Sequence, residues 1–484
     1  MSIHDLPPLA GALGRLGATP TGVPSMPARP TRAAVSPATP PRVPGPPSEV
    51  DWQLVVTLRR EAAEAISDAG SGWMASRGQP MPEADRRVQG RSIIRRVVHA
   101  HAQALGDSGE ALWPMELETR YADAVESAAF GYGRLQPLFE LPEAENIEIH
   151  GCDSVMVQYG DGRRVPHPAV ADSDDELVDA IRFLGETASP PRPFDDLHPT
   201  MTLALGNRFR LHAIGFGLSY RPSVVIRQHR LTDVTLADLA EGGMLPPHLA
   251  RMLQSAVLAR KSIVISGDQG AGKTTLLRAL IAAIHPNERF GTLETDYELL
   301  THLLRNRRNV LALQARVGMG ETSGGVGVGD YTVADLIPEA LRQNLTRLVV
   351  GEVRGAEAGA MFEALQSGAG VLSTTHSHSA ASTIDRLAAR VAQGRVLSIE
   401  DAMNQIAHHI DFLVHVQLTD DTWRGGTRRR FVSEVRQLTG AVEAGRPATH
   451  VVYRAASATE GELYQPEAGM SRELAEFDGV SLWT

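Results

Sequence analysis

Eight residues, Gly267 to Thr274, read Gly-Asp-Gln-Gly-Ala-Gly-Lys-Thr and match the whole phosphate-binding P-loop pattern. In such a loop the glycines, including Gly270 and Gly272, let backbone N–H groups point at phosphate oxygens. Lys273 would place its charge on the β and γ oxygens, and Thr274 would offer a hydroxyl to Mg²⁺. The pattern therefore predicts a site for a nucleoside triphosphate, with ATP and Mg²⁺ as the expected ligands.

Acidic and histidine side chains follow three later apolar runs. Glu294, Asp296 and Glu298 come after the first run, Glu352 ends the second, and His376 ends the third. Hydrolysis of a γ-phosphate needs charge neutralisation, a held metal and an oriented water. A single acid after a strand is often only a helix cap. Here the acids and the histidine all follow one P-loop in this order, which favours a catalytic role in hydrolysis over helix capping.

Short β-branched strands and amphipathic helices must position these groups. A strand precedes the P-loop and a helix follows it, and further strand-like runs alternate with helices. The segments are 262–266, 274–284, 290–293, 348–350 and 371–375. This alternation predicts an α/β fold, a RecA-like P-loop NTPase domain with a mostly parallel sheet. Ligands of such sheets bind at the carboxyl ends of the strands.

The chain divides into five segments. Residues 1–48 hold 12 of the 30 prolines and are predicted to be a disordered tail. Residues 49–135 show helical periodicity, and 136–230 alternate as in a smaller α+β N-terminal domain with an antiparallel sheet. Residues 231–455 form the RecA-like domain, and 456–484 are predicted to be a C-terminal tail.

The RecA-like domain is expected to close with a hairpin that pairs residues 411–417 with 430–435. Arg428, Arg429 and Arg430 form a charge run in this hairpin. A solvated strand edge is the default interpretation of such a run, in preference to a binding patch.

The composition narrows the class of protein. The 484 residues carry a net charge of −10, which argues against a general nucleic-acid binder. Cys152 is the only cysteine, which excludes an internal disulfide and fits a reducing cytoplasm. No stretch of 18 apolar residues and no secretory signal is recognisable, so any membrane role is expected to come through partners.

These motifs resemble the type II/type IV secretion ATPase superfamily, and most closely its CpaF/TadA branch, which powers tight-adherence (Flp) pili. The resemblance covers about residues 125–455. Its motifs are the Walker A stretch 267–275, the aspartate box 292–299, the Walker B stretch 348–355 and the histidine box 368–376. The histidine box departs from the family pattern, because Gly368-Ala369-Gly370 lacks the usual first histidine.

The resemblance assigns roles to particular residues. The catalytic candidates are Lys273, Glu298, Glu352 and His376. The magnesium candidates are Thr274 and Glu352. The nucleotide-binding candidates are Gly267, Gly270, Ala271, Gly272, Lys273, Thr274, Thr275, Arg208, Arg227, Arg316 and Arg354. Among the arginines, Arg208 and Arg227 would come from the N-terminal domain, and Arg316 would contact a neighbouring site.

The resemblance also implies an assembly. Subunits would form a homohexameric ring with ATP between the two domains. The ring would drive an inner-membrane platform from the cytoplasmic face, with no nucleic acid involved. Three alternatives stay open: a conjugative or type IV secretion traffic ATPase, a nucleotide-binding scaffold with little turnover, and a RecA-like nucleic-acid motor.

Overall fold

The computed structural model describes thirteen stretches of the chain. They are residues 50–108, 113–188, 191–206, 208–304, 307–316, 322–323, 326–327, 329–355, 357–366, 368, 370–394, 397–458 and 460–478. The proline-rich tail predicted at residues 1–48 lies outside them.

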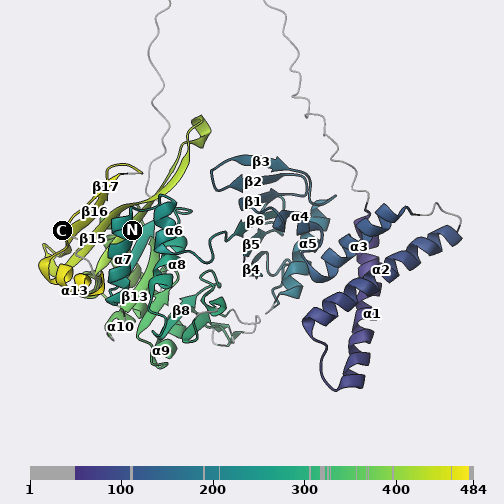
Figure 1. Ribbon diagram of the computed structural model, residues 1–484, viewed down its shortest axis with the longest axis horizontal. Coiled ribbons are helices and arrows are strands. Elements are labelled where there is room, and N and C mark those ends of the chain that lie inside the picture. The colour runs from purple at the N-terminus through teal and green to yellow at the C-terminus, as the bar shows by residue number, and fades with distance from the viewer. Residues whose placement is uncertain are drawn as a thin grey trace, which may run out of the picture. The chain divides into compact units, whose positions relative to one another are not determined.

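Three long helices form the helical region (Figure 1). They are α1 (Trp52–Arg77), α2 (Glu83–Asp107) and α3 (Met115–Phe130). The Asp51 side chain caps α1 by accepting the backbone N–H of Gln53 at 2.9 Å. Apolar residues three, four and seven apart face inward and give this region its own core, which includes Val55, Leu58, Ile94, Val98 and Val125. The predicted helices are confirmed.

An antiparallel sheet of six strands follows, in the order β3-β2-β1-β6-β5-β4. Its strands are β1 (Ala144–His150), β2 (Val155–Tyr159), β3 (Arg164–His167), β4 (Thr200–Leu205), β5 (Phe209–Ile214) and β6 (Ser223–Gln228). The helix α5 (Asp174–Thr187) covers the sheet with Leu177, Ile181 and Leu184, which share a core with its strands. The short helices η1 (Gly133–Leu135) and α4 (Gln136–Phe139) lead into β1. The α+β domain expected from the alternation is present.

The second domain is built on a sheet of nine strands. Six of them are parallel, in the order β14-β7-β13-β12-β8-β9. They are β7 (Ile263–Gly267), β8 (Phe290–Glu294), β9 (Val310–Gln314), β12 (Arg347–Val350), β13 (Gly370–His376) and β14 (Phe412–Asp420). This is the predicted α/β, RecA-like arrangement.

Helices cover both faces of this sheet. One layer consists of α6 (Leu236–Glu241), α7 (Pro247–Leu258) and α8 (Lys273–Ala283). The other layer consists of α9 (Val333–Leu341), α10 (Glu357–Gln366), α11 (Ala380–Gln393) and α12 (Ile399–His409). The short elements η2 (Thr301–Leu303), β10 (Thr322–Ser323) and β11 (Val326–Gly327) lie between β8 and α9 in the chain.

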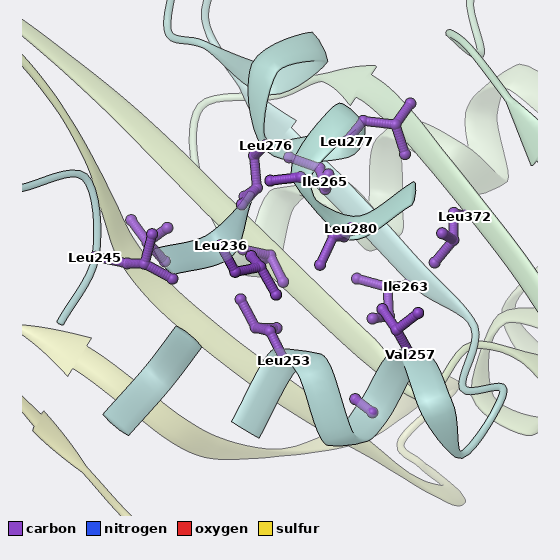
Figure 2. Close-up of a cluster of buried hydrophobic side chains, with 14 of the residues drawn as sticks. Leu236, Leu245, Leu253, Val257, Ile263, Ile265, Leu276, Leu277, Leu280 and Leu372 are labelled. Carbon is purple, nitrogen blue, oxygen red and sulfur yellow. The ribbon is translucent and has the colours of Figure 1, made fainter. Parts of the chain in front are cut away.

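Successive side chains of the central strand β7 point to opposite faces of the sheet and contribute to two separate cores. In β7, Ile263 and Ile265 point into the core under α6, α7 and α8, while Val264 points into the core on the other side. Figure 2 shows the first core, in which Leu276 and Leu280 of α8 lie close to the two isoleucines. Because β7 is buried on both faces, its carboxyl end, from which the P-loop starts, is held in a fixed place.

The C-terminal part extends the sheet with antiparallel strands. They are β15 (Arg428–Glu443), β16 (Arg446–Ala455) and β17 (Gly461–Leu463), preceded by the short helix η3 (Thr422–Arg424) and followed by α13 (Ala468–Asp478). The predicted hairpin is confirmed and is longer than expected. The segment 456–484, predicted to be a tail, contains β17 and α13. Its helix belongs to the core, because Leu474 is fully buried there.

We therefore expect Leu474→Ala to destabilise the domain by about 2–5 kcal/mol, the usual cost of emptying a packed leucine site. The free energy of unfolding in urea would measure this. Glu476→Ala, on the exposed side of the same helix, serves as the control and should change stability by less than about 0.5 kcal/mol. Equal stability of the two variants would show that α13 does not contribute to the core.

Candidate nucleotide-binding site

The P-loop connects β7 to α8 in a conformation that requires glycine. Gly272, immediately before α8, has φ +97°, a region that residues with a side chain rarely adopt. Gly267 packs so closely that an added Cβ would lie 2.2 Å from the carbonyl oxygen of Val416. The Lys273 ammonium points back into the loop and donates to the carbonyls of Gly267 at 3.1 Å and Asp268 at 3.0 Å.

A cleft of about 840 Å³ opens beside this loop. Its volume lies in the range of small-molecule and cofactor sites. Most of the residues that the sequence proposed for the site line it, namely Arg227, Gly270, Gly272, Lys273, Thr274, Thr275, Glu298, Glu352, Arg354 and His376. Gly267 and Ala271 belong to the same loop, but they are buried and do not line the cleft.

Four of these side chains form a continuous polar chain. The His376 Nδ1 lies 3.2 Å from the Lys273 ammonium, which donates to it, so the proton of the neutral ring belongs on Nε2. The other ring nitrogen, Nε2, lies 3.0 Å from Glu352 Oε1, an ion-pair distance, although this oxygen accepts no hydrogen bond from the described residues. The other oxygen of Glu352 accepts from Arg354 at 2.6 Å. The histidine thus connects the P-loop lysine to the Walker B carboxylate.

The environment adjusts the charge of both ends of this chain. Burial alone would raise the pKa of Glu352, but the close contact with His376 and the hydrogen bond from Arg354 outweigh it and lower the pKa to about 2. Burial lowers the pKa of Lys273 to about 8, although the Glu352 and Asp268 carboxylates oppose this shift. At neutral pH the carboxylate is therefore ionised and the ammonium is mostly charged.

The three acids of the aspartate box have different surroundings. Glu294 Oε1 accepts the backbone N–H groups of Glu298 at 2.9 Å and Leu299 at 2.7 Å. Burial, assisted by the Glu298 charge, raises the pKa of Glu294 to about 8 despite these two bonds. Arg210, from β5 of the N-terminal domain, pairs with both Glu298 and Asp296. Glu294 therefore fixes the loop that presents Glu298 to the cleft.

The site also fits a magnesium ion bound together with a phosphate. A smaller recess of about 40 Å³ is lined by Thr274, Glu294, Glu298 and Glu352, among other residues. Glu294 Oε2 is buried at this recess with no hydrogen-bond partner among the described residues. Within the described stretches no group of three or more His, Cys, Asp or Glu side chains is arranged to hold a metal alone. Phosphate oxygens and water would complete the shell, as is usual for Mg²⁺.

Part of the lining of the cleft is apolar. Leu231, Val234, Leu239 and Met244 contribute this wall. A flat, weakly polar group fits such a wall better than a phosphate does, because burying an unpaired charge there would be costly. The sequence pattern did not identify this wall.

Two of the predicted nucleotide-binding arginines do not line the cleft. Arg208 is not among the described residues that line the cleft, whereas Arg210 is. The guanidinium of Arg208 lies near the ring of Phe209, 5.7 Å from its centroid. In β5 the side chains of Phe209 and Leu211 point into the core. Because successive side chains of a strand point to opposite faces, the sequence could have predicted that Arg210 lies on the face away from the core. Arg227 lines the cleft and donates to Asn146 at 3.1 Å.

Arg316 also lies outside the lining of the cleft. Its Nε donates to the carbonyl of Gly329 at 2.7 Å, and it pairs with Tyr331 through a backbone bridge. The structure therefore does not bring Arg316 to the nucleotide site of its own chain. Its contact with a neighbouring subunit stays a prediction.

Two cleft arginines were misjudged from the sequence. The charge run of the hairpin was expected at a solvated strand edge, but the side chains of Arg428 and Arg430 are only 7% and 24% exposed. Both line the cleft. The expectation was wrong because β14 pairs directly with β7, which places the start of β15 beside the P-loop. No local pattern carries that information.

Arg278 was missed as well. It is buried, and its guanidinium donates to the carbonyls of Glu298 and Leu231. A charge in the middle of the otherwise apolar part of helix α8 was the signal that could have revealed it. Its bonds connect the helix after the P-loop to the aspartate box.

Comparison with known proteins agrees with this arrangement of motifs. The sequence profile of the family described as Type II/IV secretion system protein matches residues 198–454. The chain belongs to this family. The matched region contains the P-loop, the aspartate box, Glu352 and His376.

Relatives within the type II/IV secretion family include a Mycobacterium tuberculosis protein provisionally named as a conjugal transfer protein. It is 32% identical over 328 residues, which is 65% of this chain and 87% of that protein. Protein VirB11 of Agrobacterium fabrum is 29% identical over 182 residues, 37% of this chain and 50% of its own length. The crystal structure of the ATPase DotB of Legionella pneumophila is 21% identical, with a TM-score of 0.42 over 61% of this chain and 77% of that one.

The structure of this family member includes no helix, within the described residues, that is both long and apolar enough to span a bilayer.

Proposed function

We propose that this protein is a Mg²⁺-dependent ATP hydrolase that powers pilus assembly or secretion. The observation that supports this most strongly is the convergence of the P-loop with Glu298, Glu352 and His376 on one cleft. Separate elements supply these groups, so a chance glycine-rich turn would not bring them together. The cleft combines a phosphate cradle, acids and an apolar wall, which suits a nucleoside triphosphate.

Each polar group has a role in this proposal. Backbone N–H groups of the P-loop and the Lys273 ammonium bind the β and γ phosphates. The ionised Glu352 orients the attacking water, and His376 holds that carboxylate in relation to Lys273. Thr274 and the neighbouring acids would hold Mg²⁺, which supplies charge neutralisation for phosphoryl transfer when it is bound.

The arginines support a coupling role. Arg210 and Arg227 come from the N-terminal domain and line the same cleft as the P-loop. A planar guanidinium can bridge a phosphate across a domain boundary. Binding and loss of the γ-phosphate would then change how the two domains close. This is the mechanical step that we propose for a homohexameric motor.

Within the family we propose a role in a CpaF/TadA-like system that assembles Flp-type pili. The subunits would work at the cytoplasmic face of the membrane on an inner-membrane platform. The conjugative alternative has specific support, because one relative is named as a conjugal transfer protein. Neighbouring genes discriminate the two: prepilin and platform genes favour the pilus, whereas relaxase and coupling-protein genes favour conjugation.

Steady-state phosphate release from the purified protein tests the enzymatic proposal. We expect turnover with ATP and Mg²⁺ and its loss when EDTA removes the metal. Release at background level in both conditions, together with tight nucleotide binding, would favour a nucleotide-binding scaffold.

The lowered pKa of Lys273 makes nucleotide binding sensitive to pH. Only the charged ammonium attracts phosphate, and its pKa is about 8 in the nucleotide-free protein. Above pH 8 the Lys273 side chain must take up a proton before ADP binds. The affinity for ADP should therefore fall by up to about tenfold per pH unit. Below that pH it should level off. Titration with a fluorescent ADP analogue between pH 7.5 and 9.5 would measure this.

Lys273→Arg is the matched control for this pH dependence. An arginine stays charged throughout the range, so the affinity of this variant should fall less steeply with pH than that of the unmodified protein. Any slope that remains is expected from Glu294, whose pKa is also about 8. A flat profile for the unmodified protein would show that the ammonium of Lys273 does not titrate in the site.

A further inference from the structure

A cluster of charged side chains at the rim of the cleft connects three distant segments. Glu145, at the start of β1, accepts from Arg430 at 2.6 Å through Oε1 and from Arg428 at 3.3 Å through Oε2. Both arginines stand at the start of β15. The Nε of Arg430 also donates to the carbonyl of Gly270 in the P-loop, at 2.7 Å. One guanidinium therefore contacts both the N-terminal domain and the phosphate-binding loop.

The cluster is sheltered from solvent. The side chains of Glu145, Arg428 and Arg430 are 18%, 7% and 24% exposed. At this degree of burial, salt screens a pair less than it does at the surface. A guanidinium is planar and rigid, so its bond to Glu145 fixes the direction of its bond to Gly270. Moving the carboxylate therefore moves the Arg430 group that donates to the Gly270 carbonyl of the P-loop.

Close packing surrounds this cluster on both sides. An added Cβ on Gly272 would lie 3.5 Å from Cδ of Arg430, so the arginine stem runs along the second half of the P-loop. An added Cβ on Gly162, in the turn between β2 and β3, would lie 2.7 Å from Cγ2 of Thr422. The hairpin of β14 and β15 is therefore in contact with the N-terminal domain at a second place.

We propose that Arg430 is a positioning residue for nucleotide binding, which acts through the Gly270 carbonyl and is held in place by Glu145. Displacement of the N-terminal domain withdraws Glu145, frees the guanidinium and loosens the P-loop. Domain position and nucleotide affinity are then coupled through one side chain. This inference rests on the proposed nucleotide site, but the rigidity of the loop can be measured without any nucleotide.

The first experiment uses hydrogen–deuterium exchange of the full chain without nucleotide. We expect amides of residues 267–272 to exchange several-fold faster in Glu145→Gln and in Arg430→Gln than in the unmodified protein. Arg446→Gln is the control. Arg446, at the start of β16, makes an exposed ion pair with Asp385 of α11 at 2.7 Å, so this variant also removes an arginine from an ion pair. Unchanged exchange of the P-loop in Glu145→Gln would overturn the proposal.

The second experiment is a double-mutant cycle on affinity for a fluorescent ADP analogue. We expect each single variant to bind about tenfold more weakly, within the range usual for coupled sites. The double variant should bind no more weakly than the singles, because both changes break one connection. Effects that multiply in the double variant would overturn the proposal.

Two outcomes separate this inference from the proposed function. If the unmodified protein binds no ADP, the proposed function fails, and the exchange experiment still decides whether Glu145 holds the P-loop. If Glu145→Gln melts at a lower temperature than the unmodified protein, Glu145→Asp replaces it. The shortened carboxylate should give intermediate exchange of the P-loop, and exchange equal to the unmodified protein would again overturn the proposal.

Discussion

Replacing Lys273 with alanine should abolish nucleotide binding at working concentrations. The ammonium is buried within the P-loop, bonded to the carbonyls of Gly267 and Asp268 and adjacent to His376. Removing one charge of a buried pair commonly costs about 2–5 kcal/mol, which is roughly 30- to several-thousand-fold in affinity. Calorimetric titration with ADP and with a slowly hydrolysed ATP analogue would measure the loss.

The chain supplies a matched control, because Lys261 is its only other lysine. It lies just before β7, whereas Lys273 follows that strand, and it pairs with Glu473 at 2.6 Å. Lys261→Ala removes the same charge and should leave nucleotide affinity within about twofold, since distant sites rarely couple. Undiminished binding by Lys273→Ala would show that the P-loop is not a phosphate site.

Glu352→Gln should keep nucleotide binding and lose hydrolysis. Glutamine has nearly the same shape and still offers an oxygen to the Nε2–H group of His376, so the cleft is expected to keep its form. It cannot carry the negative charge that the lowered pKa secures for Glu352. Loss of a group that orients or activates the attacking water typically slows a reaction by about 10²–10⁴-fold. Phosphate release at saturating ATP measures the change.

Glu357→Gln is the control for this variant. Glu357 follows the same strand, and its carboxylate accepts the backbone N–H of Gly355 at 2.9 Å, so it acts on the local backbone. Turnover should stay within a few-fold of the unmodified protein. Loss of binding by Glu352→Gln would assign that carboxylate a structural role. Equal background rates for Glu352→Gln and the unmodified protein would favour a scaffold without turnover.

Local sequence patterns were sufficient for the centre of the candidate site. The P-loop is a contiguous motif, and Glu352 and His376 each end an apolar strand. Parallel strands in one sheet have their carboxyl ends at the same edge. The groups meet there because β7, β13 and β12 are neighbours in the sheet. Local patterns place each group at that edge, but they do not specify the order of the strands.

Local patterns were not sufficient where two distant segments meet. Arg430 and Glu145 are 285 residues apart, and Arg210 and Glu298 are 88 apart. A charge run looks the same in sequence whether water or a carboxylate faces it. The pairing of β14 with β7 decides which of the two holds for Arg428 and Arg430.

The amino-acid sequence alone determined the fold class, the membership of the P-loop proteins and the residues expected at the phosphates. Backbone geometry and strand periodicity are local properties, so a single segment can express them. The tertiary structure decided which arginines line the cleft, that α13 belongs to the core, and that the N-terminal domain contacts the P-loop through Arg430. Those outcomes depend on which charges and apolar faces the fold brings together from distant parts of the chain. Once such a charge is buried, it must pair with the groups that surround it.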